Sequence, residues 1–203
     1  MTRRFSGSQL LVASHNAGKL EEIARLLVPY GVAAVSAADL GLPEPAETEN
    51  TFVGNARIKA HAAAQATGLP ALSDDSGIEV EALGNAPGVY TADWAETPDG
   101  RDFEMAMTKT WVLLEAANAP FPRRARFCCT LVMAWPDGHD EVFAGSMAGR
   151  VVWPMRGNQG HGYDPIFQPD GFDITFGEMD RWQKNEISHR AEAFRKLVKG
   201  CFA

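Results

Sequence analysis

Cysteines and long apolar segments are both scarce in this sequence of 203 residues. The three cysteines are Cys128, Cys129 and Cys201. Because the first two are neighbours on one predicted strand, they point to opposite faces, and no disulfide framework or zinc motif is visible. No apolar run approaches the roughly 20 residues of a membrane-spanning helix, and the apolar segment 10–13 is too short for a signal peptide. We therefore expect a cytoplasmic protein without a membrane partner.

Basic residues are also in the minority. The chain has 19 lysines and arginines against 26 aspartates and glutamates, which gives a formal net charge of -7. No basic stripe is present that could displace counterions from a phosphate backbone, so nucleic acid is not an expected partner. A small phosphorylated ligand stays compatible with this charge where basic residues gather locally. The length suits a single globular domain, residues 1–203, which buries about 70% of its unfolded surface.

The first candidate site is the loop Ser14–Lys19, between a predicted strand at 10–13 and a helix whose apolar positions include Leu20, Ile23 and Leu27. A strand-to-helix junction directs backbone N–H groups and the positive end of the helix dipole at the loop. Lys19 adds a full charge, so a phosphate is the natural ligand. The Walker A spacing is absent, and an ordinary helix start is an equal alternative.

A second candidate site combines the acidic loop 43–50 with the helix predicted over 52–67. A glutamate of this loop could bind a metal, or the loop could be solvated, with Thr48 or Thr51 capping the helix. Asn55 and Lys59 stand four residues apart and share one helical face. That face either lies at a binding site or is solvated.

The segment Ser73–Gly77 carries two adjacent acids, Asp74 and Asp75, and its composition predicts a turn before strand-like alternation resumes at Ile78. Adjacent carboxylates repel each other unless a cation is near. Because side chains of extended chain alternate, Asp75 can face a ligand while Asp74 supports the turn. A solvated loop is the alternative interpretation.

The middle of the chain is interpreted as scaffold. A helix is predicted from an N-cap at Asp99 to about Asn118. Two strands, 127–135 and 142–149, form a predicted hairpin with His139 at its exposed tip.

Functional residue types return in the last third of the chain. The glycine-rich loop 157–165 contains His161, Tyr163 and Asp164, and its glycines would allow close approach of a ligand; a long irregular connection is the alternative. Ser188 is a predicted cap of the final helix, which would fix His189 and Arg190 near its first turn.

Six motifs occur in a fixed order across essentially the whole chain: SHNAGK, AETENTF with NARIKA, LSDDSGIEVEALGNAPGVY, GHGYDPIF, TFGEM and KNEISHR. In this order they closely resemble the inosine triphosphate pyrophosphatase family. The resemblance implies an α/β fold with two lobes around a long mixed β-sheet, a nucleotide cleft between the lobes and a homodimer. It also implies Mg2+-dependent hydrolysis of ITP, dITP and XTP to the nucleoside monophosphate and pyrophosphate.

The resemblance also implies roles for individual residues. Glu47 and Asp75 would bind Mg2+, Asp75 would accept the proton of the attacking water, and Lys19 would act on the leaving group. The substrate-binding residues would be Ser14, His15, Asn16, Ala17, Gly18, Lys19, Asn55, Lys59 and Ser76 together with the nucleoside set His161, Gly162, Tyr163, Asp164, Lys184, His189 and Arg190. A pyrophosphatase with another base preference, such as a pyrimidine triphosphate, and a non-catalytic nucleotide-binding module are the alternatives.

Three positions depart from the family pattern. His161 stands where the family has an aromatic residue, usually phenylalanine, although a neutral imidazole can still stack on a base. Gly54 replaces a common glutamate, and Asp93 replaces an arginine. For the base, Lys184 and Arg190 can only donate hydrogen bonds, which suits the O6 acceptor of hypoxanthine or xanthine and not the amino group of adenine.

Overall fold

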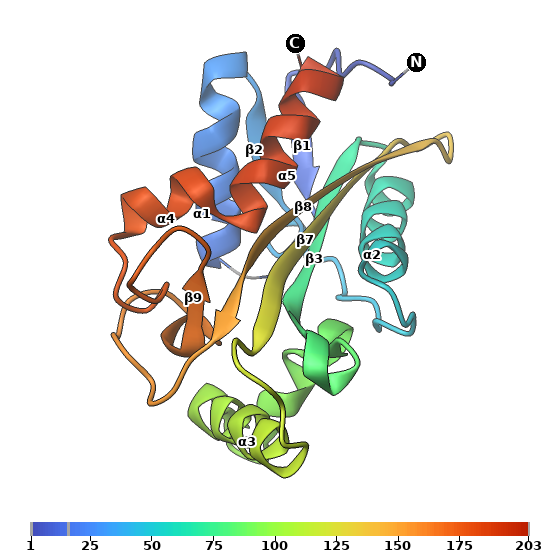
Figure 1. Ribbon diagram of the computed structural model, residues 1–203. Helices are drawn as coiled ribbons and strands as arrows, with labels where there is room; N and C mark the ends of the chain where they lie inside the picture. Colours follow the sequence, from blue (N-terminus) through green and yellow to red (C-terminus); the bar gives the residue numbers. More distant parts are fainter. Residues whose placement is uncertain (1, 16, 203) are drawn as a thin grey trace. The chain divides into compact units, whose positions relative to one another are not determined.

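The computed structural model describes residues 2–15 and 17–202, and it has an α/β fold with a mixed sheet (Figure 1). The chain forms two compact units. Unit 1 comprises Met1–Asp75, Thr130–Ala144 and Ala193–Ala203, and unit 2 comprises Ser76–Cys129 and Gly145–Glu192. The strands are β1 (Gln9–Val12), β2 (Ala33–Ser36), β3 (Ala71–Val80), β4 (Ala86–Pro87), β5 (Glu96–Thr97), β6 (Gly100–Arg101), β7 (Arg124–Ala134), β8 (Asp140–Val151) and β9 (Phe167–Pro169). The helices are α1 (Ala17–Leu27), α2 (Phe52–Thr67), α3 (Phe103–Ala116), α4 (Arg181–Ile187) and α5 (His189–Leu197).

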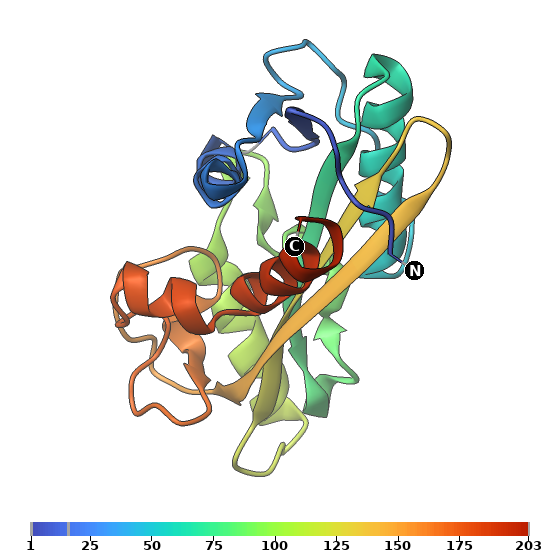
Figure 2. The same ribbon diagram turned by 90° about the horizontal axis from the view of Figure 1, so that it is seen from above.

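The main sheet has the order β2-β1-β3-β7-β8-β9, with β4 paired to β3. Strand β1 is parallel to both β2 and β3, with Leu11 opposite Ala71, whereas β8 and β9 are antiparallel. The predicted α/β class and mixed sheet are therefore confirmed. Strands β3, β7 and β8 each contribute residues to both units, and the turn from β7 to β8 can be followed in Figure 2.

In unit 1, β1 is apolar on both faces because parallel strands are covered on both sides. Leu10, Leu11 and Val12 are fully buried. Helix α2 contributes four buried alanines to the same core, Ala56, Ala60, Ala63 and Ala64. Their small side chains allow the helix backbone to approach its neighbours closely, so the polar residues of α2 have fixed positions.

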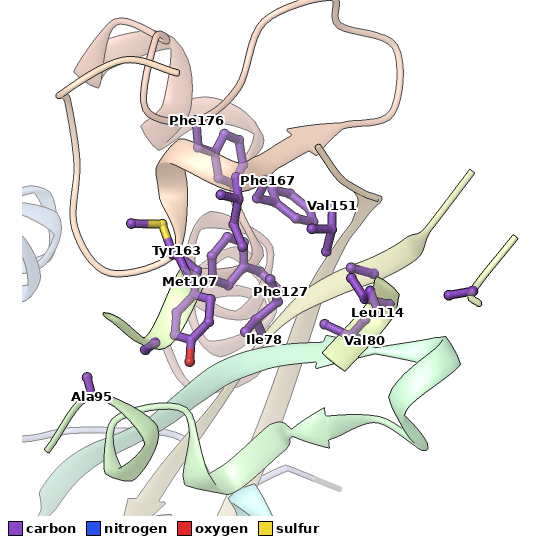
Figure 3. Packing of buried hydrophobic residues seen from close by; sticks show 14 of the residues in the cluster. Ile78, Val80, Ala95, Met107, Leu114, Phe127, Val151, Tyr163, Phe167 and Phe176 are labelled. Atoms are coloured by element: carbon purple, nitrogen blue, oxygen red, sulfur yellow. The ribbon is translucent and has the colours of Figure 1, made fainter. Parts of the chain in front are cut away.

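The core of unit 2 combines aliphatic side chains with the aromatic rings of Phe127, Tyr163, Phe167 and Phe176 (Figure 3). The Phe127 ring lies 4.6 Å from the Phe167 ring, edge to face, and is stacked 5.9 Å from the Phe176 ring. Tyr163 extends into the same cluster, where Met107 of α3 also lies. This core holds the end of the glycine-rich loop in place.

Two sequence predictions about elements were wrong. Asp74 and Asp75 lie in the interior of strand β3 and not in a turn. Helix α3 begins at Phe103, because Asp102 accepts a hydrogen bond from the Met105 N–H at 2.9 Å and is the N-cap, three residues after the predicted cap at Asp99. Helix α4 was not predicted. Its N-cap Asp180 accepts from the Trp182 and Gln183 N–H groups.

The predicted helix over 52–67, the long hairpin with exposed His139 and the Ser188 cap are confirmed. Among the described residues, none of the helices has both the length and the apolar character needed to cross a membrane.

Candidate functional site

The loop after β1 and the first turn of α1 form the first part of the candidate site, in unit 1. Helix α1 begins at Ala17, so its N-terminal N–H groups face this loop. The Lys19 ammonium lies 2.7 Å from the Asp74 carboxylate, and the His15 Nε2 atom lies 2.9 Å from the Leu42 carbonyl oxygen. Ser14 is half-buried and Gly18 is exposed. Asn16 lies outside the described residues.

The buried polar segment of β3 forms the second part of the site. Ser73, Asp74 and Asp75 are 1%, 4% and 7% exposed. The Ser73 hydroxyl donates to the Ala56 carbonyl of α2 at 2.5 Å. Because a buried charge is unfavourable unless it is paired or hydrogen-bonded, the side chains around these acids determine whether the strand is stable.

Helix α2 supplies two of those side chains. Thr51 caps the helix by accepting from the Gly54 N–H at 3.1 Å. The Asn55 amide donates to Asp75 Oδ2 at 3.3 Å, and its oxygen accepts from the Glu49 N–H at 2.9 Å. One turn later, the Lys59 ammonium is hydrogen-bonded to Glu47 Oε1. Asn55 and Lys59 therefore share a buried face, and the alternative of a solvated helix face is wrong.

The acids and cations of this cluster change one another's proton affinity. The pKa of the Asp75 carboxyl is raised to about 6, mainly by burial and further by the charges of Glu47 and Asp74, against the opposing effects of Lys59 and Asn55. Burial lowers the pKa of Lys59, but Asp74, Glu47 and Asp75 together outweigh it, so the net shift is upward. The cluster therefore favours additional positive charge.

The donor atoms fit a hard divalent cation that also binds substrate. Glu47 and Asp75 offer carboxylate oxygens, and Mg2+ usually takes one or two carboxylates together with phosphates and waters. Within the described residues, no three His, Cys, Asp or Glu side chains are grouped so that they could hold a metal ion. A complete coordination shell here requires oxygens from a ligand or from water.

A cavity of about 100 Å³ lies in unit 1 beside this cluster. Apolar side chains form most of its wall, among them Leu42, Pro43 and Pro45 of the acidic loop and Ala63 of α2, and Lys59 also lines it.

The nucleoside set of the sequence prediction lies in unit 2. The Lys184 ammonium of α4 forms an ion pair with Asp164, which is only 2% exposed. The same carboxylate accepts from the His161 N–H at 2.7 Å. A side chain at Gly160 would collide with this carboxylate. Asp164 therefore fixes both the glycine-rich loop and the Lys184 head group.

Two other members of the set have their rings in the core. Tyr163 is 1% exposed and contacts Phe103 edge to face at 6.2 Å. Burial raises the pKa of its phenol to about 12, against a smaller opposite effect of Thr110. His189 is buried and stacks on Phe127 at 5.0 Å and 14°. Both rings are packing groups in this structure.

The remaining members of the set are closer to the surface. The His161 side chain is exposed. Gly162 has a φ of +66°, which favours glycine. Arg190 is half-buried. Ser76, which is not part of the nucleoside set, is also half-buried and is the first residue of unit 2.

The structure shows the surroundings of two positions that depart from the family pattern, Gly54 and Asp93. A Cβ atom at Gly54 would lie 2.6 Å from the Glu49 Cβ atom, so the Glu49 side chain occupies the space that a side chain at position 54 would need. Asp93 is exposed in a 3-10 turn, and nothing in the structure explains the aspartate there.

Sequence reasoning missed the specific partners of the acids. It placed Lys19 and Lys59 near the two acids but did not assign Lys19 to Asp74 or Lys59 to Glu47. It also missed the stacking of the Phe127 ring on the His189 ring. An aromatic residue in an apolar strand does not indicate which residue it will contact in the folded protein.

Comparison with known proteins supports one family. A model of the Ham1 family matches residues 10–200. A dITP/XTP pyrophosphatase of Ruegeria pomeroyi is 69% identical over 202 residues, covering 100% of this chain and 99% of that protein. A dITP/XTP pyrophosphatase of Agrobacterium fabrum is 55% identical over 210 residues, covering 98% of each.

Solved structures agree with this result. A HAM1 protein from Coxiella burnetii has a TM-score of 0.89 at 35% identity and covers 95% of this chain and 98% of that one. A nucleoside-triphosphatase, dITP/XTP pyrophosphatase, from Mycobacterium abscessus has a TM-score of 0.77 at 35% identity, with 94% and 98% covered. The resemblance drawn from the six motifs is confirmed, and the chain belongs to the Ham1 family.

Proposed function

We propose that this protein hydrolyses deaminated purine nucleoside triphosphates, ITP, dITP and XTP, to the nucleoside monophosphate and pyrophosphate. The names of its full-length relatives support the substrate class. The observation in the structure that carries the proposal is the cluster in unit 1, where Lys19 pairs with Asp74, Lys59 pairs with Glu47, and buried Asp75 is bonded to Asn55.

In this proposal, unit 1 binds the triphosphate. Lys19 and the N-terminus of α1 attract the negative phosphate oxygens. Asp75, with its pKa near 6, is largely ionised at neutral pH and accepts a proton from the attacking water. The water oxygen bonds to the α-phosphorus, the bond from that phosphorus to the bridging oxygen breaks, and pyrophosphate leaves. Lys19 stabilises the charge on the leaving group, an effect of about 3 kcal/mol for one such donor.

Glu47 and Asp75 are the residues proposed to hold Mg2+. When bound there, the ion supplies charge neutralisation at the phosphates. The required carboxylates are within electrostatic reach of each other, because Glu47 contributes to the raised pKa of Asp75.

We propose that side chains of unit 2 recognise the purine base. Lysine carries three N–H donors, and the ion pair to Asp164 leaves the Lys184 ammonium with donors for the O6 atom of hypoxanthine or xanthine. Adenine presents an amino group at that position, which would leave a donor facing a donor. Buried unpaired polar groups of this kind give discrimination of roughly 10⁴. We also propose a homodimer that acts in the cytoplasm.

The reaction can be tested with ITP in ¹⁸O-labelled water. We expect labelled IMP, unlabelled pyrophosphate and loss of turnover in EDTA. Label in the pyrophosphate, or release of inorganic phosphate, would contradict attack at the α-phosphorus. Binding of ITP without turnover would support the alternative of a non-catalytic nucleotide-binding module.

A further inference from the structure

Lys59 has an unusual environment for a lysine. Its side chain is 10% exposed, and lysines are almost never buried without a partner. Its ammonium is hydrogen-bonded to Glu47 Oε1, and the carboxylates of Asp74 and Asp75 also act on its charge. One ammonium therefore interacts with three acids.

Lys19 is paired with a different acid from the one that Lys59 contacts. Its ammonium is paired with Asp74 at 2.7 Å and its side chain is 29% exposed. Glu47, in the acidic loop 43–50, forms an ion pair with Lys59 of α2. The two ion pairs thus join the cations to different carboxylates, and the partner of Lys59, Glu47, is a residue proposed as a metal ligand.

We propose that Lys59 is a positioning residue that holds Glu47 in the metal-free protein and that makes metal binding depend on substrate. The inference rests on the proposed Mg2+ site. A divalent cation and an ammonium group that share the Glu47 carboxylate repel each other. Metal binding to the ligand-free protein is therefore opposed by Lys59. A bound triphosphate supplies new negative oxygens for the ammonium, so substrate removes this opposition.

The surroundings of Lys59 allow the exchange. Lys59 lines the small cavity of unit 1, together with Leu42, Pro43 and Pro45 of the segment that leads to Glu47. A void beside the loop and the lysine stem lets both adjust without displacing the packed alanines of α2. Because binding energies are reciprocal, metal must also strengthen the binding of substrate by the same factor.

The test measures the affinity of Mn2+ for the nucleotide-free protein by electron paramagnetic resonance. The variants are wild type, Lys59→Met, which keeps an unbranched apolar stem, and Lys19→Met as the matched control that removes a cation from Asp74. We expect Lys59→Met to bind Mn2+ about 10-fold more tightly than wild type or better, because the repulsion at Glu47 is gone. Lys19→Met should change the affinity less.

A thermal-unfolding series provides a second measurement. In EDTA, Lys59→Met should unfold at a lower temperature than wild type, and Mn2+ should raise its midpoint more than that of wild type. Lys59→Gln serves the same purpose if the methionine variant does not fold. Equal Mn2+ affinities for wild type and the Lys59 variants would overturn the inference, as would an equal gain in Lys19→Met.

The proposed function has a separate criterion in the same experiment. Turnover of ITP by wild type in EDTA would overturn the metal site itself. Metal-dependent turnover combined with unchanged Mn2+ affinity in Lys59→Met would overturn only the role of Lys59.

Discussion

Asp74 and Asp75 are neighbours in β3 with different partners, and this difference agrees with the different roles proposed for them. Asp74 is paired with Lys19 at 2.7 Å. Asp75 receives a long hydrogen bond of 3.3 Å from Asn55 and has a raised pKa. The weaker compensation of Asp75 suits a group that must accept a proton or a metal. Alternation along the strand predicted two unequal acids, with Lys19 and Lys59 nearby, but it did not indicate which side chain contacts which acid.

Replacement of Asp75 by asparagine should abolish turnover of ITP. The amide keeps the shape of the side chain but cannot accept the proton, and loss of a general base lowers rates by roughly 10²–10⁴-fold. The measurement is kcat with ITP and Mg2+, and Asp93→Asn, at an exposed aspartate, is the matched control. Retention of a tenth of the wild-type rate would remove Asp75 from the role of base.

The same substitution should change how stability depends on pH. The pKa of Asp75 rises from 3.8 to about 6 on folding, so the folded chain holds this proton more tightly than the unfolded chain. The contribution favours folding at about pH 4 and below and is lost as the pH rises through about 6. In EDTA, the free energy of unfolding of wild type should therefore fall relative to that of Asp75→Asn by at most about 3 kcal/mol over this range. Denaturant titrations of both proteins measure this difference, and parallel pH profiles would contradict the raised pKa.

Lys184 gives a prediction about selectivity. Lys184→Met removes the donor proposed for O6, so the ratio of kcat/KM for ITP over ATP should narrow by about 10-fold or more. Lys184→Arg, which keeps a cation beside Asp164, is the control and should retain more of the ratio. An unchanged ratio in a folded Lys184→Met protein would count against the donor argument.

At the scale of elements, local sequence patterns predicted most helices and strands. They failed where tertiary contacts determine the backbone conformation. The bounds of α2 followed from the Thr51 cap and the uninterrupted helical composition. The segment Ser73–Gly77 has residue types that favour turns, yet it is extended, because β3 is paired on the sheet and its polar side chains are bonded to α2 and Lys19. Strand propensity depends strongly on such surroundings, which the local sequence does not contain.

Gly54 provides a prediction at this scale. Alanine is ordinarily more favourable than glycine in a helix by about 1 kcal/mol. Here Gly54→Ala should instead destabilise the protein by about 1–3 kcal/mol, because the new Cβ atom meets the Glu49 side chain 2.6 Å away. The double variant Gly54→Ala with Glu49→Gly should recover part of the loss in thermal unfolding, since the contact with Thr51 Oγ1 at 2.9 Å stays. A stabilised single variant would show that Glu49 moves aside freely.

At the scale of the whole molecule, the residues predicted to act on phosphates and metal fall in unit 1, from Ser14 to Asp75, and the predicted nucleoside set falls in unit 2. Periodicity alone could not give the strand order, since it does not encode which strands pair. The ordered motifs supplied the mixed sheet through the family resemblance. A single domain over residues 1–203, a cleft between lobes and a homodimer stay predictions.

The most direct test of the account is the ratio of kcat/KM for ITP over ATP in wild type with Mg2+, with pyrophosphate and phosphate quantified separately. XTP, GTP and TTP complete the panel, since they distinguish a preference for another base. We expect pyrophosphate as the product and a ratio of roughly 10⁴, because unit 2 is proposed to recognise O6 with hydrogen-bond donors. Comparable turnover of ATP, or phosphate as the product, would contradict the account.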